Sequence, residues 1–246
     1  MNVDSIISLP TLAESGWYRR VLPVVAGGSV AVALALVFMV VPSEQVMGAV
    51  QRIFYFHVAS AFACYLSLAV LLCAGACYLV NRKLAWDLLG EAAASVAMLF
   101  ASIVLVSGMI WGHSAWNTWW RWEPRLVSFL VLWLILLSYV LLRRFADRSA
   151  QEQTFAAVLG IIAAAQVPIV IFSISLLAQS EQLHPQVVAK QGLTDLRYVA
   201  AFVIASIAMC STAIWFIAVK TGALLLRSEL IELSAHSRFR GRAMHA

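Results

Sequence analysis

Apolar residues dominate six long stretches of the chain, and short polar stretches separate them. The apolar stretches lie at about 21–41, 53–80, 91–112, 126–143, 155–178 and 198–220. A helix needs roughly 18 or more apolar residues to cross a bilayer. Inside lipid every backbone N–H and C=O must be bonded within its own segment, which favours helices. The pattern therefore predicts an all-α integral membrane protein with six transmembrane helices.

The composition agrees with this prediction. Hydrophobic residues make up 63% of the 246 residues and charged residues only 12%, whereas a soluble domain carries about a quarter charged residues. None of the polar stretches is long enough for a second domain. We therefore expect residues 1–246 to form a single polytopic membrane domain that ends in a basic tail at 221–246.

The Lys and Arg residues are distributed unequally between the two predicted sides. Twelve of the 17 fall on one side, which by the positive-inside rule should be cytoplasmic. Both termini then face the cytoplasm, and the loops near 42–52, 113–125 and 179–197 face outward. The twelve residues are Arg19, Arg20, Arg82, Lys83, Arg143, Arg144, Arg148, Lys220, Arg227, Arg238, Arg240 and Arg242. The basic excess thus indicates membrane topology and does not suggest nucleic-acid binding.

A tryptophan-rich loop between the third and fourth spans is the most unusual segment. It holds five of the nine tryptophans within twelve positions: Trp111, Trp116, Trp119, Trp120 and Trp122. The ordinary interpretation is an interfacial aromatic belt, although a belt spreads its aromatics over many helix ends. If the segment forms a helical turn, Trp116, Trp119 and Trp120 share one face. Such a face favours a platform for a large planar apolar ligand that binds by stacking.

Two histidines fall on the same outer side as this loop. His57 opens the second span in RIFYFH, and His184 follows the fifth span in QLHP. An ionisable residue at membrane depth is a candidate functional residue, although His57 alone is as readily a packing histidine. Two such histidines with an indole platform can ligate a haem iron axially and stack its ring. His113 is the alternative second ligand, whereas His236 and His245 lie on the cytoplasmic side.

Charged residues at the same level complete the candidate site. Arg52, Arg121 and Arg125 can pair with haem propionates, because the guanidinium fork matches a carboxylate. Arg121 and Arg125 can equally anchor to lipid phosphate. Glu123 and Pro124 are expected to begin the fourth span, since proline suits the first helical position and an acidic residue favours the positive helix end.

The stretch WGxxxWxTWWxWEPRL, from Trp111 to Leu126, resembles the tryptophan-rich "WWD" signature of haem-handling proteins. RIxYxH before the second span, and VPIV followed later by LHP, extend the resemblance over nearly the whole chain. The chain is similar in particular to the haem exporter protein C family, the six-span members of the bacterial cytochrome c maturation system.

The resemblance implies a specific function. His57 and His184 would be the axial ligands of non-covalently bound haem b on the outer face of the bacterial cytoplasmic (inner) membrane. The Trp loop would bind haem and present it to a membrane-tethered haem chaperone for cytochrome c biogenesis. Subunits of an ABC-type transporter would work alongside, with a small membrane accessory subunit as a further partner.

The chain departs from the family pattern in two places. Glu123 replaces the aspartate of the signature, and its side chain is a weaker helix N-cap. A Trp pair often precedes the second histidine in the family, whereas AQSEQ precedes it here. The choice between His184 and His113 as the second ligand therefore stays open.

The sequence leaves two other functions to weigh. A solute transporter usually has broken helices or charges near the midplane, and these spans are almost free of charge. A b-type cytochrome that exchanges electrons with quinone typically needs histidine pairs at two depths, and only the outer set is present. The four cysteines form neither CxxC nor CxxCH, which argues against covalent haem attachment. No nucleophile and base occur together, so a binding protein is expected rather than an enzyme.

Overall fold

The computed structural model describes residues 17–43, 47–175 and 195–243, and this part of the chain contains helices and no strands. Six of the helices are long and apolar enough to cross a membrane. They are α1 (Trp17–Ala35), α2 (Arg52–Asn81), α3 (Leu84–Trp116), α4 (Pro124–Phe145), α5 (Ala150–Phe172) and α6 (Leu196–Ala243). A π-helical turn, Leu36–Val40, extends α1, and 3-10 turns precede α2 (Ala49–Gln51) and follow α5 (Ser173–Ser175). The prediction of six spans is confirmed.

Two boundaries differ most from those predicted. Helix α3 begins at Leu84 rather than near 91, because Asp87 and Glu91 are buried inside the bundle instead of marking its surface. Helix α6 runs to Ala243, so residues 221–243 of the predicted basic tail continue the sixth helix. In both cases the end of the apolar stretch was taken as the end of the helix. A helix can continue through polar residues.

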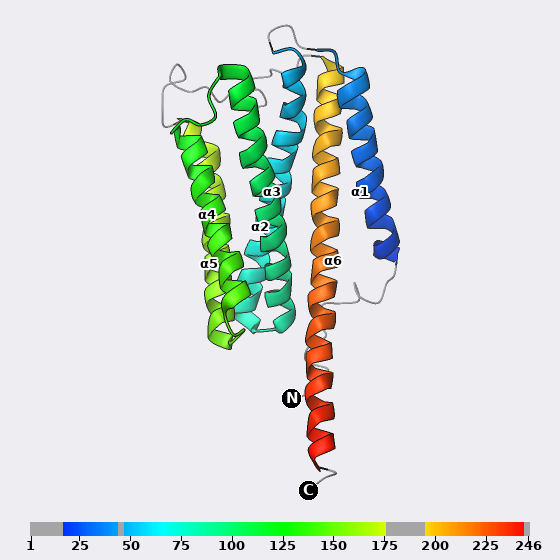
Figure 1. Ribbon diagram of the computed structural model, residues 1–246, viewed down its shortest axis with the longest axis vertical. Coiled ribbons are helices and arrows are strands. Elements are labelled where there is room, and N and C mark those ends of the chain that lie inside the picture. The colour runs from blue at the N-terminus through cyan, green and yellow to red at the C-terminus, as the bar shows by residue number, and fades with distance from the viewer. Residues whose placement is uncertain (1–16, 44–46, 176–194, 244–246) are drawn as a thin grey trace.

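Helix α2 is central to the bundle. It packs against α3, α5 and α6, while α4 lies against α5 and α3, and α1 packs on α6 (Figure 1). Alanines fill much of the interior; Ala63, Ala92 and Ala97 are completely buried. Small residues let helices approach closely, which is how membrane bundles gain van der Waals contact.

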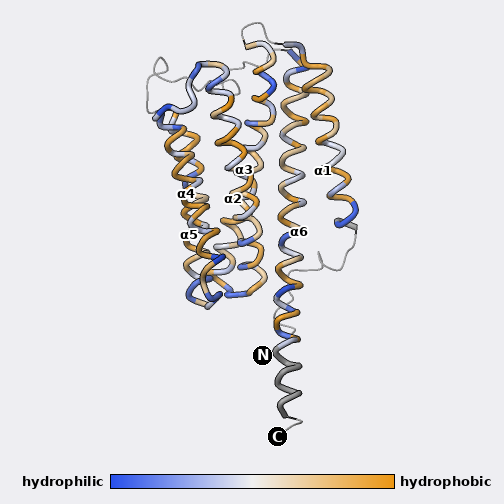
Figure 2. Tube along the Cα trace, viewed as in Figure 1, coloured by the Kyte–Doolittle hydropathy of each residue, from blue (hydrophilic) through white to orange (hydrophobic). Residues whose placement is uncertain are grey.

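The outer surface of the bundle is strongly apolar (Figure 2). Large side chains such as Val24, Met39 and Val80 are 72–85% exposed. Soluble monomeric proteins rarely expose large apolar surfaces to water. This surface is suited to contact with lipid chains.

The two ends of the bundle differ in construction. At one end α2 joins α3 through Arg82 and Lys83, and α4 joins α5 through residues 146–149. Helix α1 begins and α6 ends toward this same end (Figure 1). The opposite end contains the start of α2, the end of α3 and residues 117–123, which lead into α4. The predicted site residues in the described part of the chain all lie toward this second end.

Candidate functional site

An apolar cavity of about 490 Å³ lies at the Trp-rich end of the bundle. Its walls come from α2, α3, the 117–123 segment, α4 and the region where α5 ends. The volume falls within the roughly 300–1,000 Å³ of typical small-molecule sites. Most lining residues are aliphatic or aromatic, and a few are polar. The cavity therefore has the character of a binding site for a largely apolar molecule.

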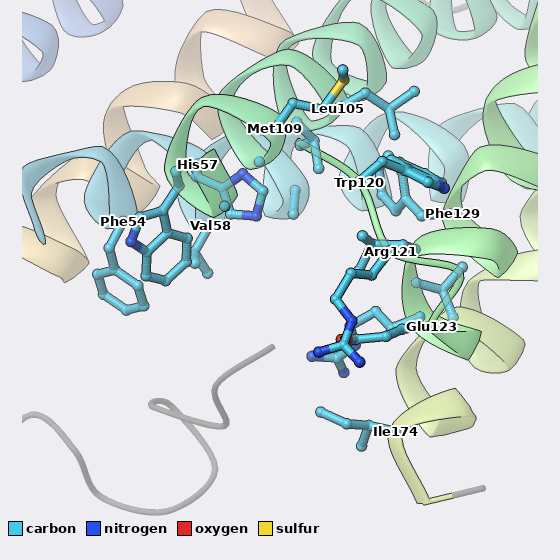
Figure 3. A pocket seen from close by; sticks show the side chains of 18 of the residues that line it. Phe54, His57, Val58, Leu105, Met109, Trp120, Arg121, Glu123, Phe129 and Ile174 are labelled. Atoms are coloured by element: carbon cyan, nitrogen blue, oxygen red, sulfur yellow. The ribbon is translucent and has the colours of Figure 1, made fainter. Parts of the chain in front are cut away.

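His57 lines this cavity from α2, and Trp120, Arg121 and Phe129 lie across from it, on the 117–123 segment and α4 (Figure 3). It is 8% exposed, and its Nδ1 lies 3.0 Å from the Ser107 hydroxyl oxygen. Trp111 contacts the imidazole edge-on, with ring centroids 5.9 Å apart. His57 lies near the start of α2, and its ring is held by neighbours on α3.

The hydrogen-bonding pattern indicates which nitrogen of His57 carries the proton. The Ser107 hydroxyl donates to the Ile103 carbonyl at 2.6 Å, so its oxygen is left to accept a hydrogen bond from His57 Nδ1–H. The backbone of Val104 also hydrogen-bonds to the imidazole. A protonated Nδ1 leaves the Nε2 lone pair as the one that can bind a metal ion.

Gly108 makes room for this histidine. A Cβ atom at position 108 would lie 3.1 Å from Cε1 of His57, closer than most real contacts. The absence of a side chain at this position on α3 thus lets the imidazole approach the helix closely. Even an alanine would push the ring away from its present position.

A sharp reversal at the end of α3 brings the Trp loop to the cavity. Asn117 adopts a left-handed conformation with φ of 52°, and its N–H donates to the His113 carbonyl at 2.9 Å. Asparagine tolerates this conformation better than most residues. The following chain folds back so closely that a Cβ on Gly112 would lie 3.1 Å from the Thr118 carbonyl oxygen.

The indoles surround the cavity without a shared helical face. Trp111, Trp116, Trp119 and Trp120 line it, whereas Trp122 does not and is 78% exposed. Helix α3 ends at Trp116, and residues 117–123 are not helical. The geometry of a helical turn was therefore wrong for this segment, because the left-handed Asn117 ends the helix. The reversal nevertheless brings Trp119 and Trp120 to the same cavity as Trp111 and Trp116.

Two buried indole N–H groups have no hydrogen-bond acceptor within the described residues. They belong to Trp111 and Trp120, both of which line the cavity. An unpaired buried donor costs free energy that a bound acceptor group would recover. This is an observation in favour of a ligand that carries oxygen acceptors as well as apolar surface.

The charged residues are divided between the cavity and its surroundings. Arg121, Glu123 and Arg125 line the cavity; Arg121 Nε lies 3.7 Å from Glu123 Oε1, and Arg125 donates to the Ile171 carbonyl at 3.2 Å. Glu123 is the N-cap residue of α4 and Pro124 its first residue, as predicted. Arg52 does not line the cavity, and its guanidinium lies 5.6 Å from the Phe38 ring centroid.

The two candidates for a second histidine ligand cannot be placed equally. His113 stacks on Trp119 with ring centroids 4.1 Å apart and does not line the cavity. His184 lies outside the described residues. Both assignments therefore remain predictions.

Sequence reasoning missed Ser107 and Gly108 as parts of the site. Serine is common in transmembrane helices, where it bonds to the backbone four residues earlier, and glycine is common there too. Their roles depend on His57, which lies 50 residues from Ser107 along the chain. The helical periodicity of α3 alone could not reveal that these two residues contact a histidine on another helix.

The chain is similar to a family of known proteins over almost its full length. Residues 10–238 match the family model described as "Heme exporter protein C". A protein of that name from Paracoccus denitrificans is 33% identical over 144 residues, which is 58% of this chain and 60% of the relative. The protein of that name from Escherichia coli K12 is 30% identical over 162 residues, 65% of each chain.

A plant relative carries a related name. A ccmC-like mitochondrial protein of Marchantia polymorpha, named for cytochrome c biosynthesis, is 32% identical over 145 residues, which is 59% of this chain and 61% of that protein. The chain thus spans about 60–65% of the length of these three curated relatives.

Proposed function

The chain belongs to the haem exporter protein C family, and from this premise we propose that it binds haem in the apolar cavity at the Trp-rich end of the bundle. The haem would be haem b, held non-covalently, and would be destined for cytochrome c biogenesis. A single observation carries the proposal. One cavity of about 490 Å³ has His57 on one wall and Trp116, Trp119 and Trp120 on others.

The residues of the cavity fit the chemistry of haem. Haem presents a broad apolar ring, two carboxylates and an iron that accepts imidazole nitrogen. His57 would supply Nε2 to the iron, and the indoles would stack on or border the ring. Arg121 and Arg125 are the lining cations suited to propionates, together with the two indole donors described above. His184, or His113 in its place, would be the second ligand.

Hand-over of haem is the second part of the proposal. Trp119 and Trp122 are 54% and 78% exposed, although both are large aromatic residues. Exposed aromatics beside a ligand cavity are typical of surfaces that bind a partner. We propose that a membrane-tethered haem chaperone docks here and receives the haem. Subunits of an ABC-type transporter and a small membrane accessory subunit would be further partners.

The proposed role is binding and transfer rather than catalysis or solute transport. Charged side chains are buried in α3, α4 and α5, but they lie at the opposite end of the bundle from the cavity and are paired with one another. This pairing offers no chain of groups through the middle of the membrane. The haem-binding proposal accounts for the cavity, its histidine and its indoles together.

The membrane orientation is tested by reporter fusions. We propose that the Trp-rich end faces the periplasm of a bacterial inner membrane, because twelve of the 17 basic residues belong to the other side. A reporter fused after Ala246 should read cytoplasmic, and one inserted near Gln186 should read external. The six-span orientation would be wrong if both reporters gave the same side.

The haem itself is tested by an absorption spectrum of the purified protein. We expect a Soret band from non-covalent haem with a six-coordinate, low-spin spectrum. Extraction with acidified organic solvent should remove all of it, since no covalent attachment is proposed. A protein purified from haem-replete cells without a Soret band, and unable to take up added hemin, would contradict the proposal.

A further inference from the structure

A second cavity lies at the opposite end of the bundle from the Trp loop. It has a volume of about 630 Å³ and is enclosed by α3, α4, the α4–α5 turn and α6. Its lining is polar and carries five basic side chains but only two acidic ones. Nothing in the proposed haem function uses this space.

The inner wall of the second cavity is a closed network of charges. Arg143 bonds to Asp87 at 2.7 Å, to Glu91 at 2.7 Å and to Glu152 at 3.1 Å. Arg148 bonds to the other oxygen of Glu91 at 2.9 Å. The three carboxylates exceed these two arginines by one negative charge, and Asp147 adds a second at the lining, so the three remaining cations leave the region with a net charge of +1.

Three basic residues remain at the mouth: Arg144, Lys220 and Arg227. Among the residues that the structure describes, none of the three forms a salt bridge. Lys220 is half-buried and donates a hydrogen bond to the neutral Ser95 hydroxyl, while Arg144 and Arg227 are exposed. Two helices that do not pack directly on each other, α4 and α6, thus hold three cations around one opening.

Exposed apolar residues neighbour two of these cations along the chain. Phe145 is 76% exposed beside Arg144, and Leu226 is 55% exposed beside Arg227. Hydrophilic residues gather at the lower ends of α2–α5 in Figure 2, while apolar residues continue above them. Arg144 lies in the last turn of α4, and Lys220 and Arg227 line the same cavity. The cations are therefore near this polar end, at the level that lipid headgroups would occupy in a membrane.

We propose that this second cavity binds the phosphate-bearing headgroup of an anionic phospholipid. The phosphate would be held by Arg144, Lys220 and Arg227, and the acyl chains would lie on the exposed apolar side chains nearby. Basic pockets between transmembrane helices on the cytoplasmic side are suited to anionic headgroups. A free phosphate would gain only the charge interaction, so the adjoining apolar surface favours the lipid.

The test is lipid retention by the full-length protein. The protein would be reconstituted with phosphatidylglycerol or phosphatidylcholine, extracted in mild detergent, and its bound lipids counted by native mass spectrometry. The wild type should retain phosphatidylglycerol at least tenfold more strongly than phosphatidylcholine. The variant R144Q/K220Q/R227Q should lose roughly 100-fold in affinity for phosphatidylglycerol, at about fivefold per cation. Its weak retention of phosphatidylcholine should not change.

The control variant R19Q/R20Q/K83Q removes the same charge from the same end of the bundle but outside the cavity lining. It should retain phosphatidylglycerol within about twofold of the wild type. Loss of lipid in the control as well would show a general charge effect and overturn the proposal. Equal retention by the wild type and R144Q/K220Q/R227Q would also overturn it.

Two further measurements separate the alternatives. Inorganic phosphate should displace phosphatidylglycerol only weakly, and tight binding of phosphate with no competition from lipid would contradict the proposal. The haem content and melting temperature of R144Q/K220Q/R227Q, measured without added lipid, should match those of the wild type. Failure of lipid binding thus leaves the haem proposal untouched, and failure of haem binding leaves this one untouched.

Discussion

The two ends of this helical bundle treat buried polar groups in opposite ways. At one end Arg143 is only 6% exposed, and three carboxylates surround it. At the other end the indole N–H groups of Trp111 and Trp120 are buried without an acceptor in the described part of the chain. The first arrangement is complete in itself, whereas the second gains hydrogen bonds only from a ligand. The contrast distinguishes a structural polar cluster from a binding site better than burial or charge does alone.

The largest effect should come from disrupting the ion network around Arg143. Arg143→Met leaves Asp87, Glu91 and Glu152 in the bundle with one of their two arginines removed. We expect the free energy of unfolding to fall by about 3–5 kcal/mol, the usual cost of stranding a buried charge. The measurement is unfolding by a denaturing detergent in mixed micelles. Arg20→Met, at an exposed position near the start of α1, should change it by less than about 0.5 kcal/mol.

A rescue variant sharpens this first prediction. Neutralising the partners as well, with D87N/E91Q/E152Q in the Arg143→Met background, should recover part of the lost stability because no unpaired carboxylate remains buried, and Arg148, which loses Glu91, is 37% exposed to solvent. If Arg143→Met were as stable as the wild type, the ion network would have no structural role. The comparison between the two ends would then fail.

The second prediction concerns the histidine at the open end. His57→Ala should lower haem affinity at least tenfold, equivalent to about 1.4 kcal/mol, and change the spectrum of the haem that remains. His113→Ala should have less effect, because His113 stacks on Trp119 outside the cavity lining. Absorption spectra after hemin titration measure both. Identical spectra for the wild type and a His57/His184 double substitution would remove the axial-ligand assignment.

The third prediction concerns the indoles, which should act in a graded way. Trp116→Ala and Trp120→Ala each remove a cavity wall, and each should weaken haem binding by about fivefold, since an aromatic contact contributes roughly 1 kcal/mol beyond burial. Trp122→Ala removes an exposed ring outside the cavity lining, so it should mainly reduce transfer to the chaperone, whereas Trp119 is both exposed and part of the lining, so Trp119→Ala should reduce binding and transfer. Co-purification of each variant with the chaperone, with haem measured on both chains, separates the two effects. Wild-type transfer in all four variants would leave the loop as an interfacial anchor.

The sequence predicted the number of spans because apolar length alone determines it. It also placed the start of α4, where Pro124 occupies the first turn after Glu123. It misplaced the start of α3 because Asp87 and Glu91 resemble a helix end. Their partner Arg143 lies more than 50 residues away along the chain. Ion pairs between helices depend on how the helices pack, and the polarity of one segment cannot predict them.

The candidate site was also only partly predictable, because contacts between helices are not visible in one segment. The Trp cluster and His57 were evident as residue types in unusual places. The reversal at Asn117 was not, because nothing in the Trp pattern distinguishes a helical turn from a left-handed end. The orienting partner of His57 was also hidden, since the hydroxyl of Ser107 is one of several similar serines in the spans. Of the predictions made here, substitution of Ser107 should have the smallest effect.

Ser107→Ala should change the reduction potential of the bound haem more than the haem affinity. The variant loses the 3.0 Å contact to Nδ1 but keeps the interaction with the Val104 backbone, so haem affinity should fall only about two- to fivefold. A hydrogen bond from Nδ1–H makes an imidazole ligand more basic and favours oxidised iron. Its loss should therefore raise the reduction potential of the bound haem, and redox titration measures this.

The matched controls are Ser114→Ala and Ser107→Thr. Ser114 donates to the Ile110 carbonyl at 2.9 Å, as Ser107 does to Ile103, but within the described residues it makes no side-chain hydrogen bond to a histidine. Ser114→Ala should leave the potential unchanged, and Ser107→Thr should restore it because the hydroxyl is kept. A purely structural serine would shift melting temperature in step with affinity and leave the potential of the remaining haem unaltered. An unaltered potential in Ser107→Ala would therefore reduce Ser107 to a packing residue, and the orientation of His57 would rest on Val104 and Gly108.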